Sequence, residues 1–192
     1  MSYQTYTTEA IVCGTYNRNT ADRSYLMFTR EAGMLYAEAK SAREERSRQR
    51  MALQDFSLVR VSLIKGKSSW KIGSIEPQTN FYSSAADKAA RGSVVMLTKF
   101  LRRFYGGQEA VPLVFDYVKA ALGFLSLTQT ERVLLEQIIL ARLLLELGYV
   151  DERVLPPVVK HPIDDLTDLA VTDELLAQLQ PIIDKAVSLS QL

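Results

Sequence analysis

The hydrophobic pattern of the chain changes its period at Pro77, and this change constrains the fold more than any other feature. From Glu9 to Glu76, apolar and polar residues alternate and β-branched and aromatic residues are frequent, which is typical of strands that bury one face. After Pro77 the apolar residues recur at helical spacing. The sequence therefore predicts an α+β protein, with a β domain over residues 1–80 and an all-α domain over residues 81–192.

Turn-forming residues divide the first domain into five predicted strands. The expected ranges are Glu9–Tyr16, Ser24–Thr29, Met34–Ala39, Phe56–Ile64 and Trp70–Glu76. Five short strands within roughly 70 residues fit an N-terminal five-stranded OB-fold β-barrel, whose closure removes exposed strand edges. A five-stranded SH3-like barrel is the alternative.

Four helices are predicted in the second domain, and glycines and prolines punctuate them. Ser84 is expected to cap a helix that reaches Tyr105, where Gly106 and Gly107 would end it at positive φ. The later helices are expected over Pro112–Ser126, Gln129–Leu147 and Val171–Val187, and apolar residues that include Val133 cover more than one face of the Gln129–Leu147 helix. The prolines predict a stiff, extended connection at Pro156, Pro157 and Pro162, and a bend or break at Pro181.

The net charge of +1 hides a strong asymmetry along the chain. Residues 1–105 hold 17 Lys and Arg against 9 Asp and Glu, whereas residues 106–192 hold 6 against 13. The positive part is therefore the candidate for binding a polyanion.

Basic residues concentrate in the segment Lys40–Arg50, which lies between the third and fourth predicted strands. Phosphates bind such groups with release of condensed counterions, although an ordinary solvated loop has the same composition. Further cations fall in the first and fourth loops, which border the oligonucleotide face of OB barrels. The residues expected to contact nucleic acid are Arg18, Arg23, Lys40, Arg43, Arg46, Arg48, Arg50, Lys65, Lys67, Trp70, Lys71, Arg102 and Arg103.

Aromatic residues of the predicted barrel are candidates for stacking on unpaired bases. They are Tyr16, Tyr25, Tyr36 and Trp70. Trp70 is the strongest candidate because Lys67 and Lys71 flank it, while burial in the core is the alternative for each of them.

Catalytic and cofactor-binding motifs are absent from the sequence. The single Cys13 alternates with apolar residues and is expected to be buried, and the single His161 is expected on a solvated loop. We therefore expect no enzymatic activity, cofactor, disulfide or metal site. No apolar run is long enough to span a membrane and no export sequence opens the chain, so we expect a cytoplasmic protein.

Several short motifs, in this order and spacing, resemble the amino-terminal domain of the bacterial recombination mediator RecO. They are the AIV strand at Ala10–Val12, D-R-x-x-x-x-F-T-R-E-x-G at Asp22–Gly33, A-K-x-A-R at Ala39–Arg43, and L-Q-x-F at Leu53–Phe56. These motifs span about two fifths of the chain. The later VFDYVKAALGFL and LLLELGY segments are similar to the helical domain of that family.

The resemblance implies a mediator that binds single- and double-stranded DNA and anneals complementary strands without consuming nucleotide. It further implies that the protein acts with RecR to replace single-strand-binding protein with RecA, in association with the nucleoid. Many members carry a four-cysteine zinc site, which one cysteine cannot form, and Ser41 stands where glycine is frequent. The functional alternative is an adaptor that does not bind DNA and whose acidic helical part contacts other proteins.

Overall fold

The computed structural model describes residues 5–18, 22–40, 47–66, 69–168 and 173–190. The chain forms two compact units, residues 1–84 with 106–115, and residues 85–105 with 116–192. Residues 106–115 belong with the strands because the Met34 N–H donates to the Gly107 carbonyl at 2.8 Å and Phe115 packs on Phe28 with ring centroids 5.4 Å apart. A domain boundary at residue 80 stays a prediction.

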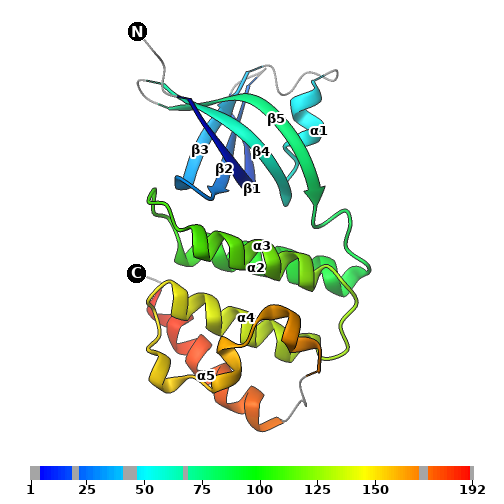
Figure 1. Cartoon of the computed structure of the whole chain (residues 1–192), viewed down its shortest axis with the longest axis vertical. Helices are drawn as coiled ribbons and strands as arrows, with labels where there is room; N and C mark the ends of the chain where they lie inside the picture. Colours follow the sequence, from blue (N-terminus) through cyan, green and yellow to red (C-terminus); the bar gives the residue numbers. More distant parts are fainter. Residues whose placement is uncertain (1–4, 19–21, 41–46, 67–68, 169–172, 191–192) are drawn as a thin grey trace. The chain divides into compact units, whose positions relative to one another are not determined.

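The first unit is a closed five-stranded barrel (Figure 1). Its strands are β1 (Thr5–Asn17), β2 (Arg23–Thr29), β3 (Gly33–Ala39), β4 (Ser57–Lys65) and β5 (Trp70–Asn80). They follow one another around the barrel in the order β1-β2-β3-β5-β4, and β3 pairs with β5 in parallel while the other pairs are antiparallel. This arrangement confirms the predicted OB-type barrel followed by helices.

Strand β1 closes the barrel because it pairs with β2 on one side and β4 on the other. A register shift between Val12 and Gly14 places an irregularity at Cys13, and such a bulge bends a strand sharply. The Cys13 side chain is buried, as predicted. The barrel interior is filled by a cluster that includes Tyr25, Met27, Leu35 and Leu63.

A short helix, α1 (Arg48–Ala52), interrupts the connection between β3 and β4 that was expected to be a loop. It contacts β5, and Leu53, which follows it, is buried in the barrel core. At Phe56 the chain enters β4 with φ of 69°, and the Phe56 ring stacks on Tyr82 with centroids 5.5 Å apart.

The second unit contains α2 (Lys88–Phe104), most of α3 (Pro112–Leu125), α4 (Arg132–Glu146) and α5 (Asp173–Leu189). Helix α2 is amphipathic and buries Val94, Leu97 and Leu101. Helix α4 is apolar on more than one face, as predicted, but Val133 in its first turn is 62% exposed and not buried.

The predicted end of α2 near Tyr105 is confirmed, but the predicted cap at its start and the predicted positive φ after its end are wrong. Asp87 caps α2 by accepting from the Ala90 N–H, whereas Ser84 donates its hydroxyl to the Asn80 carbonyl. At the other end, Tyr105 is already extended, so the helix stops before Gly106, and positive φ occurs at Gly33 and Gly148 instead.

The proline-containing connection is also different from the predicted extended segment. It folds into three short 3₁₀ helices, η1 (Glu152–Val154), η2 (Pro157–Lys160) and η3 (Ile163–Asp168). Pro157 stands in the first turn of η2, where the missing N–H leaves no hydrogen bond unmade. Helix α5 continues past Pro181 without a break.

Candidate nucleic-acid interface

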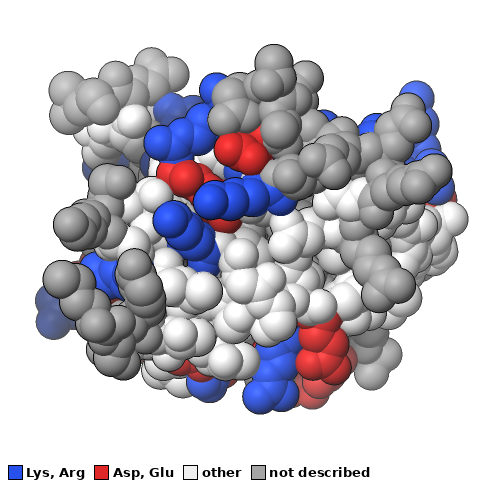
Figure 2. All heavy atoms as spheres, turned by 90° about the horizontal axis from the view of Figure 1, so that it is seen from above, with Lys and Arg blue, Asp and Glu red and all other residues white. Residues whose placement is uncertain are grey.

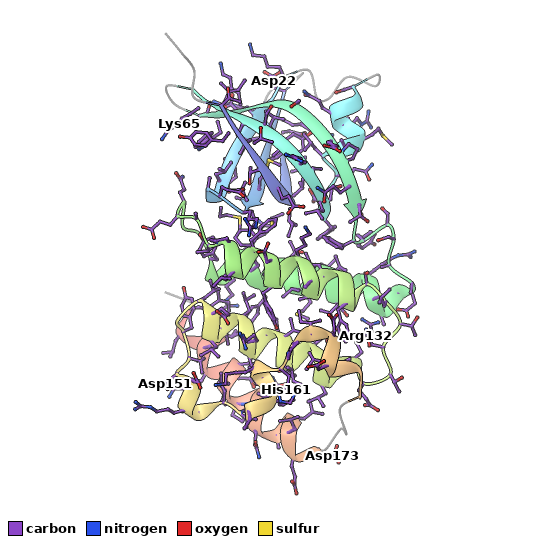
Figure 3. The ribbon with its side chains drawn as sticks, viewed as in Figure 1. Asp22, Lys65, Arg132, Asp151, His161 and Asp173 are labelled. Atoms are coloured by element: carbon purple, nitrogen blue, oxygen red, sulfur yellow. The ribbon has the colours of Figure 1, made fainter. Side chains whose placement is uncertain are left out.

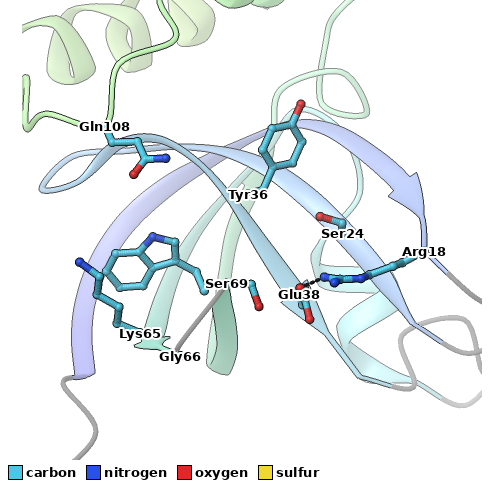
Figure 4. Close-up of a pocket in the computed structure, with 9 residues that line it drawn as sticks. Arg18, Ser24, Tyr36, Glu38, Lys65, Gly66, Ser69 and Gln108 are labelled. Atoms are coloured by element: carbon cyan, nitrogen blue, oxygen red, sulfur yellow. Dashed lines mark ion pairs between the residues drawn. The ribbon is translucent and has the colours of Figure 1, made fainter.

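A cleft of about 470 Å³ lies on the outside of the barrel beside β3 (Figure 4). Arg18 follows β1 at the start of the first loop, and Gly66 and Ser69 belong to the loop between β4 and β5. The described residues that line the cleft are Arg18, Ser24, Tyr36, Glu38, Lys65, Gly66, Ser69, Trp70 and Gln108. The cleft therefore lies between the two loops that border the oligonucleotide face of OB barrels.

Two cations face the cleft from different parts of the barrel, Arg18 from the start of the first loop and Lys65 from the end of β4. Arg18 and Lys65 lie on opposite sides of it in the close-up, and Arg18 forms an ion pair with Glu38 (Figure 4). The Arg18 N–H also donates to the Asp22 carbonyl at 3.3 Å, which closes the base of the first loop. The structure therefore brings together Arg18 and Lys65, which are far apart in the sequence.

Trp70 combines an apolar contact with a cationic neighbour. Its ring meets Tyr6 edge to face with centroids 5.5 Å apart, and the Lys65 ammonium lies 5.5 Å from its ring centre. One part of Trp70 packs against the barrel core, and it also lines the cleft. An indole ring and an ammonium in one cleft match the pairing of stacking surface and charge that single strands require.

The predicted aromatic candidates separate into surface and core residues. Tyr36 is 55% exposed at the cleft, and its ring meets Tyr16 edge to face with centroids 5.8 Å apart. Tyr25 is fully buried in the barrel core. Burial raises the pKa of the Tyr25 hydroxyl, while the neighbouring Arg23 guanidinium opposes this change in part.

Arg23 is half-buried at the start of β2 and is not among the cleft residues. Its Nε is buried without a hydrogen-bond acceptor, and its charge acts on Tyr25. Part of the Arg23 guanidinium is thus directed toward the protein interior.

The remaining predicted barrel residues occupy several positions around the first unit. Lys40, Arg50 and Lys71 are exposed, and Figure 3 shows that Lys65 points outward from the barrel. Arg48 lies in α1. Arg43, Arg46 and Lys67 lie outside the residues that the structure describes.

Arg102 and Arg103 lie on the last turn of α2, in the second unit. Arg103 donates from Nε to the Ser190 hydroxyl at 2.7 Å and from its guanidinium to the Val187 carbonyl at 2.6 Å. These bonds tie α2 to the end of α5, so this arginine already has acceptors within its own unit.

On the face seen from above, Lys and Arg side chains of the described residues lie beside Asp and Glu side chains in one central group, and uncharged residues cover much of the surface around it (Figure 2). Electrostatic attraction of a polyanion is then concentrated at local groups such as the cleft cations.

Within the described part of the chain, neither a cluster of metal-binding side chains nor a membrane-spanning helix is present. That part contains no group of three or more His, Cys, Asp or Glu residues arranged to hold a metal ion. None of its helices combines the length and the apolar character that crossing a membrane requires. His161 is exposed after η2, as predicted (Figure 3).

Five cleft residues, Ser24, Glu38, Gly66, Ser69 and Gln108, were not identified from the sequence as site residues. Ser24, Glu38 and Ser69 are small or charged residues with no distinctive spacing, and Gln108 comes from a segment that follows α2 in sequence. The alternation along β3 is the one sequence signal for Glu38, because it places Glu38 on the same outward face as Tyr36.

Comparison with known proteins gives one family and a consistent group of relatives. Residues 1–81 match the family model described as recombination protein O N terminal. Proteins from two strains of Desulfitobacterium hafniense, DSM 10664 / DCB-2 and Y51, each named DNA repair protein RecO, are 34% identical to this chain over 76 residues. The match covers 40% of this chain and 28% of each relative.

Proposed function

Because residues 1–81 match the family model of the recombination protein O N-terminal domain, we propose that this chain binds single- and double-stranded DNA during repair and recombination. Its barrel would bind the DNA, and the helical unit would serve as scaffold and partner surface. The names of the similar proteins, DNA repair protein RecO, support the biological setting.

One observation carries the proposal, namely the composition of the cleft between the first and fourth loops. Trp70 and Tyr36 offer aromatic surfaces, and Arg18 and Lys65 offer cations, within one depression of about 470 Å³. Unpaired bases stack on aromatic rings while the sugar-phosphate chain follows the positive charges. Lys71 is exposed on β5 directly after Trp70 and extends this positive group.

We further propose that the protein anneals complementary strands and, together with RecR, replaces single-strand-binding protein with RecA. Annealing requires only that charges on two strands be neutralised while their bases remain accessible, so it needs no nucleotide hydrolysis. The work would take place on cytoplasmic, nucleoid-associated DNA. Pairing of complementary oligonucleotides in the absence of ATP tests this activity, and a strict ATP requirement would refute it.

A salt titration tests DNA binding at the cleft. Replacing both Lys65 and Lys71 with alanine should weaken binding to an oligothymidylate and lower the slope of log affinity against log salt by roughly two units. The matched control removes two exposed cations of the second unit, Arg153 and Lys185, and should leave the slope unchanged. Absence of any binding by the wild-type protein at low salt would favour the adaptor alternative.

A further inference from the structure

We infer that Glu38 acts as a built-in competitor for phosphate, holding Arg18 while the cleft is empty and releasing it to the nucleic acid on binding. This inference rests on the proposed function, since it describes how the same cleft selects its ligand. It assigns a specificity role to a carboxylate in a site that otherwise attracts anions.

The positions of the two side chains make such an exchange possible. Glu38 lies on the outward face of β3, opposite Ser24 of β2 and Lys71 of β5. Arg18 is fixed at its backbone by the hydrogen bond to Asp22 and reaches Glu38 through its side chain. The ion pair therefore connects the base of the first loop to the wall of the cleft (Figure 4).

Exposure differs between the partners, and this difference determines which one moves. The Arg18 side chain is 54% exposed, whereas the Glu38 side chain is 21% exposed. Arg18 can rotate toward solvent, while Glu38 stays in the wall. A phosphate that arrives from solvent meets the guanidinium first, and guanidinium groups bind phosphate through two parallel hydrogen bonds.

The charge of Glu38 opposes anion binding in its own right. Among the described residues that line the cleft, Glu38 is the one carboxylate beside the cations Arg18 and Lys65. Because the Arg18 side chain is more than half exposed, solvent weakens its pair with Glu38, and the pair yields to a ligand of higher charge. A single phosphate gains little from this exchange, whereas a strand that also stacks on Trp70 and neutralises Lys65 gains enough to complete it.

The consequence is a cleft that prefers a nucleic-acid strand over isolated phosphate groups and that releases its ligand readily. Rapid release suits a protein that passes strands between partners. Removal of the carboxylate should therefore improve binding, which is the reverse of what mutation of a binding residue normally does.

The test measures binding of a fluorescent oligothymidylate to the full chain by anisotropy, between 50 and 400 mM salt. Glu38→Gln should bind about five- to tenfold more tightly at roughly 0.1 M salt, with a salt slope steeper by about one unit. Arg18→Ala should weaken binding in the wild-type background, because the guanidinium that the strand would take over is missing, and it should remove most of the gain in the Glu38→Gln background. Inorganic phosphate should compete better against the Glu38→Gln variant than against the wild-type protein.

The matched control is Glu76→Gln, which removes an exposed carboxylate of β5 that is not among the cleft residues. Its affinity should stay within about twofold of wild type, and an equal gain in both variants would overturn the inference by showing a bulk charge effect. If wild-type protein binds and folded Glu38→Gln binds no more tightly, the inference fails while the proposed function stands. If neither binds at 50 mM salt, the proposed function itself fails.

Discussion

The ammonium of Lys65 lies 5.5 Å from the centre of the Trp70 ring. These residues face each other across the antiparallel pair formed by the end of β4 and the start of β5. The tight connection between the strands therefore places a cation and an aromatic surface together at one wall of the cleft.

Replacing Trp70 with alanine should weaken binding of single-stranded DNA by about 1–3 kcal/mol, because a base loses its stacking partner. Duplex binding should weaken less, since paired bases are not available for stacking. Trp70→Phe should recover much of the loss. Anisotropy titrations with both DNA forms measure the effect.

The control for this substitution is Tyr82→Ala, which removes a partly exposed aromatic residue that stacks on Phe56. It should leave DNA affinity unchanged. Because Trp70 also packs against the core, each variant is compared at a temperature where its circular dichroism shows a folded barrel. Equal losses for single-stranded and duplex DNA would contradict a stacking role.

Arg132 fixes the connection between α3 and α4 and should be important for stability. Its guanidinium donates to the Ser93 hydroxyl at 2.8 Å, to the Leu125 carbonyl at 2.9 Å and to the Leu127 carbonyl at 2.7 Å. Arg132→Ala leaves these acceptors without their donor, so the free energy of unfolding should fall by about 1–3 kcal/mol. Urea denaturation of the full chain measures the loss.

The matched control is Arg153→Ala, because Arg153 is exposed in η1. Its effect on the free energy of unfolding should stay within about 0.5 kcal/mol. Arg132→Lys should recover only part of the stability, since an ammonium cannot reach three acceptors in the planar arrangement of a guanidinium. Full stability of Arg132→Ala would show that water replaces these hydrogen bonds.

Tyr117 should make the protein sensitive to alkali. Burial raises the pKa of its hydroxyl well above the usual 10.0, although Arg142 opposes this rise. Above about pH 10 the unfolded chain loses this proton while the folded chain keeps it, so the free energy of unfolding falls as pH rises. The slope contributed is up to about 1.4 kcal/mol per pH unit.

Urea denaturation of wild type and Tyr117→Phe at pH 8, 10 and 11 checks this prediction. The Tyr117→Phe variant should lose less stability between pH 8 and pH 11. Some alkaline sensitivity should remain, because burial also raises the pKa of Tyr25. Parallel losses in the two proteins would show that Tyr117 ionises equally in both states.

Two glycines should respond to alanine in opposite directions. Gly148 follows α4 with φ of 77°, and the N–H groups of Gly148 and Tyr149 donate to the Leu145 and Leu144 carbonyls. Alanine at this left-handed position should destabilise the fold by about 1 kcal/mol. Gly92 lies inside α2 with open space around it, so Gly92→Ala should stabilise the fold by roughly 0.5–1 kcal/mol.

Thermal unfolding of the two variants measures both effects, and each serves as the control for the other. A rise in melting temperature for Gly148→Ala would contradict the helix-ending role of this residue. A fall for Gly92→Ala would show that the open space beside α2 is needed.

The sequence predicts the barrel well because period-two alternation reports burial directly, as Val59, Arg60 and Val61 of β4 show. It fails at β5, which continues past Glu76 to Asn80, because Gln78 and Thr79 are polar and carry no alternation. It also fails at η2, where the prolines that indicate an extended chain equally permit a 3₁₀ turn. At such positions short-range hydrogen bonds determine the backbone conformation, and these bonds cannot be read from the composition of the segment.

The candidate site is predictable only in part. Lys65, Trp70 and Arg18 follow from their places near the first and fourth loops, since barrel topology brings those loops together. The pairing of Arg18 with Glu38 joins the first loop to β3, and several other carboxylates of the first domain offer equal alternatives in the sequence. Only the register of β1, β2 and β3 selects Glu38.

Because β3 pairs with β5 in parallel, the cleft forms only when these two strands have joined in the folded barrel. Ala37 and Glu38 of β3 lie opposite Trp70 and Lys71, so the two walls come from strands that join only when the last strand of the barrel docks. A partly assembled barrel has no such wall and cannot bind. A ligand bound there stabilises the junction of β3 and β5, so the free energy of unfolding should rise with the logarithm of the DNA concentration once that concentration exceeds the dissociation constant.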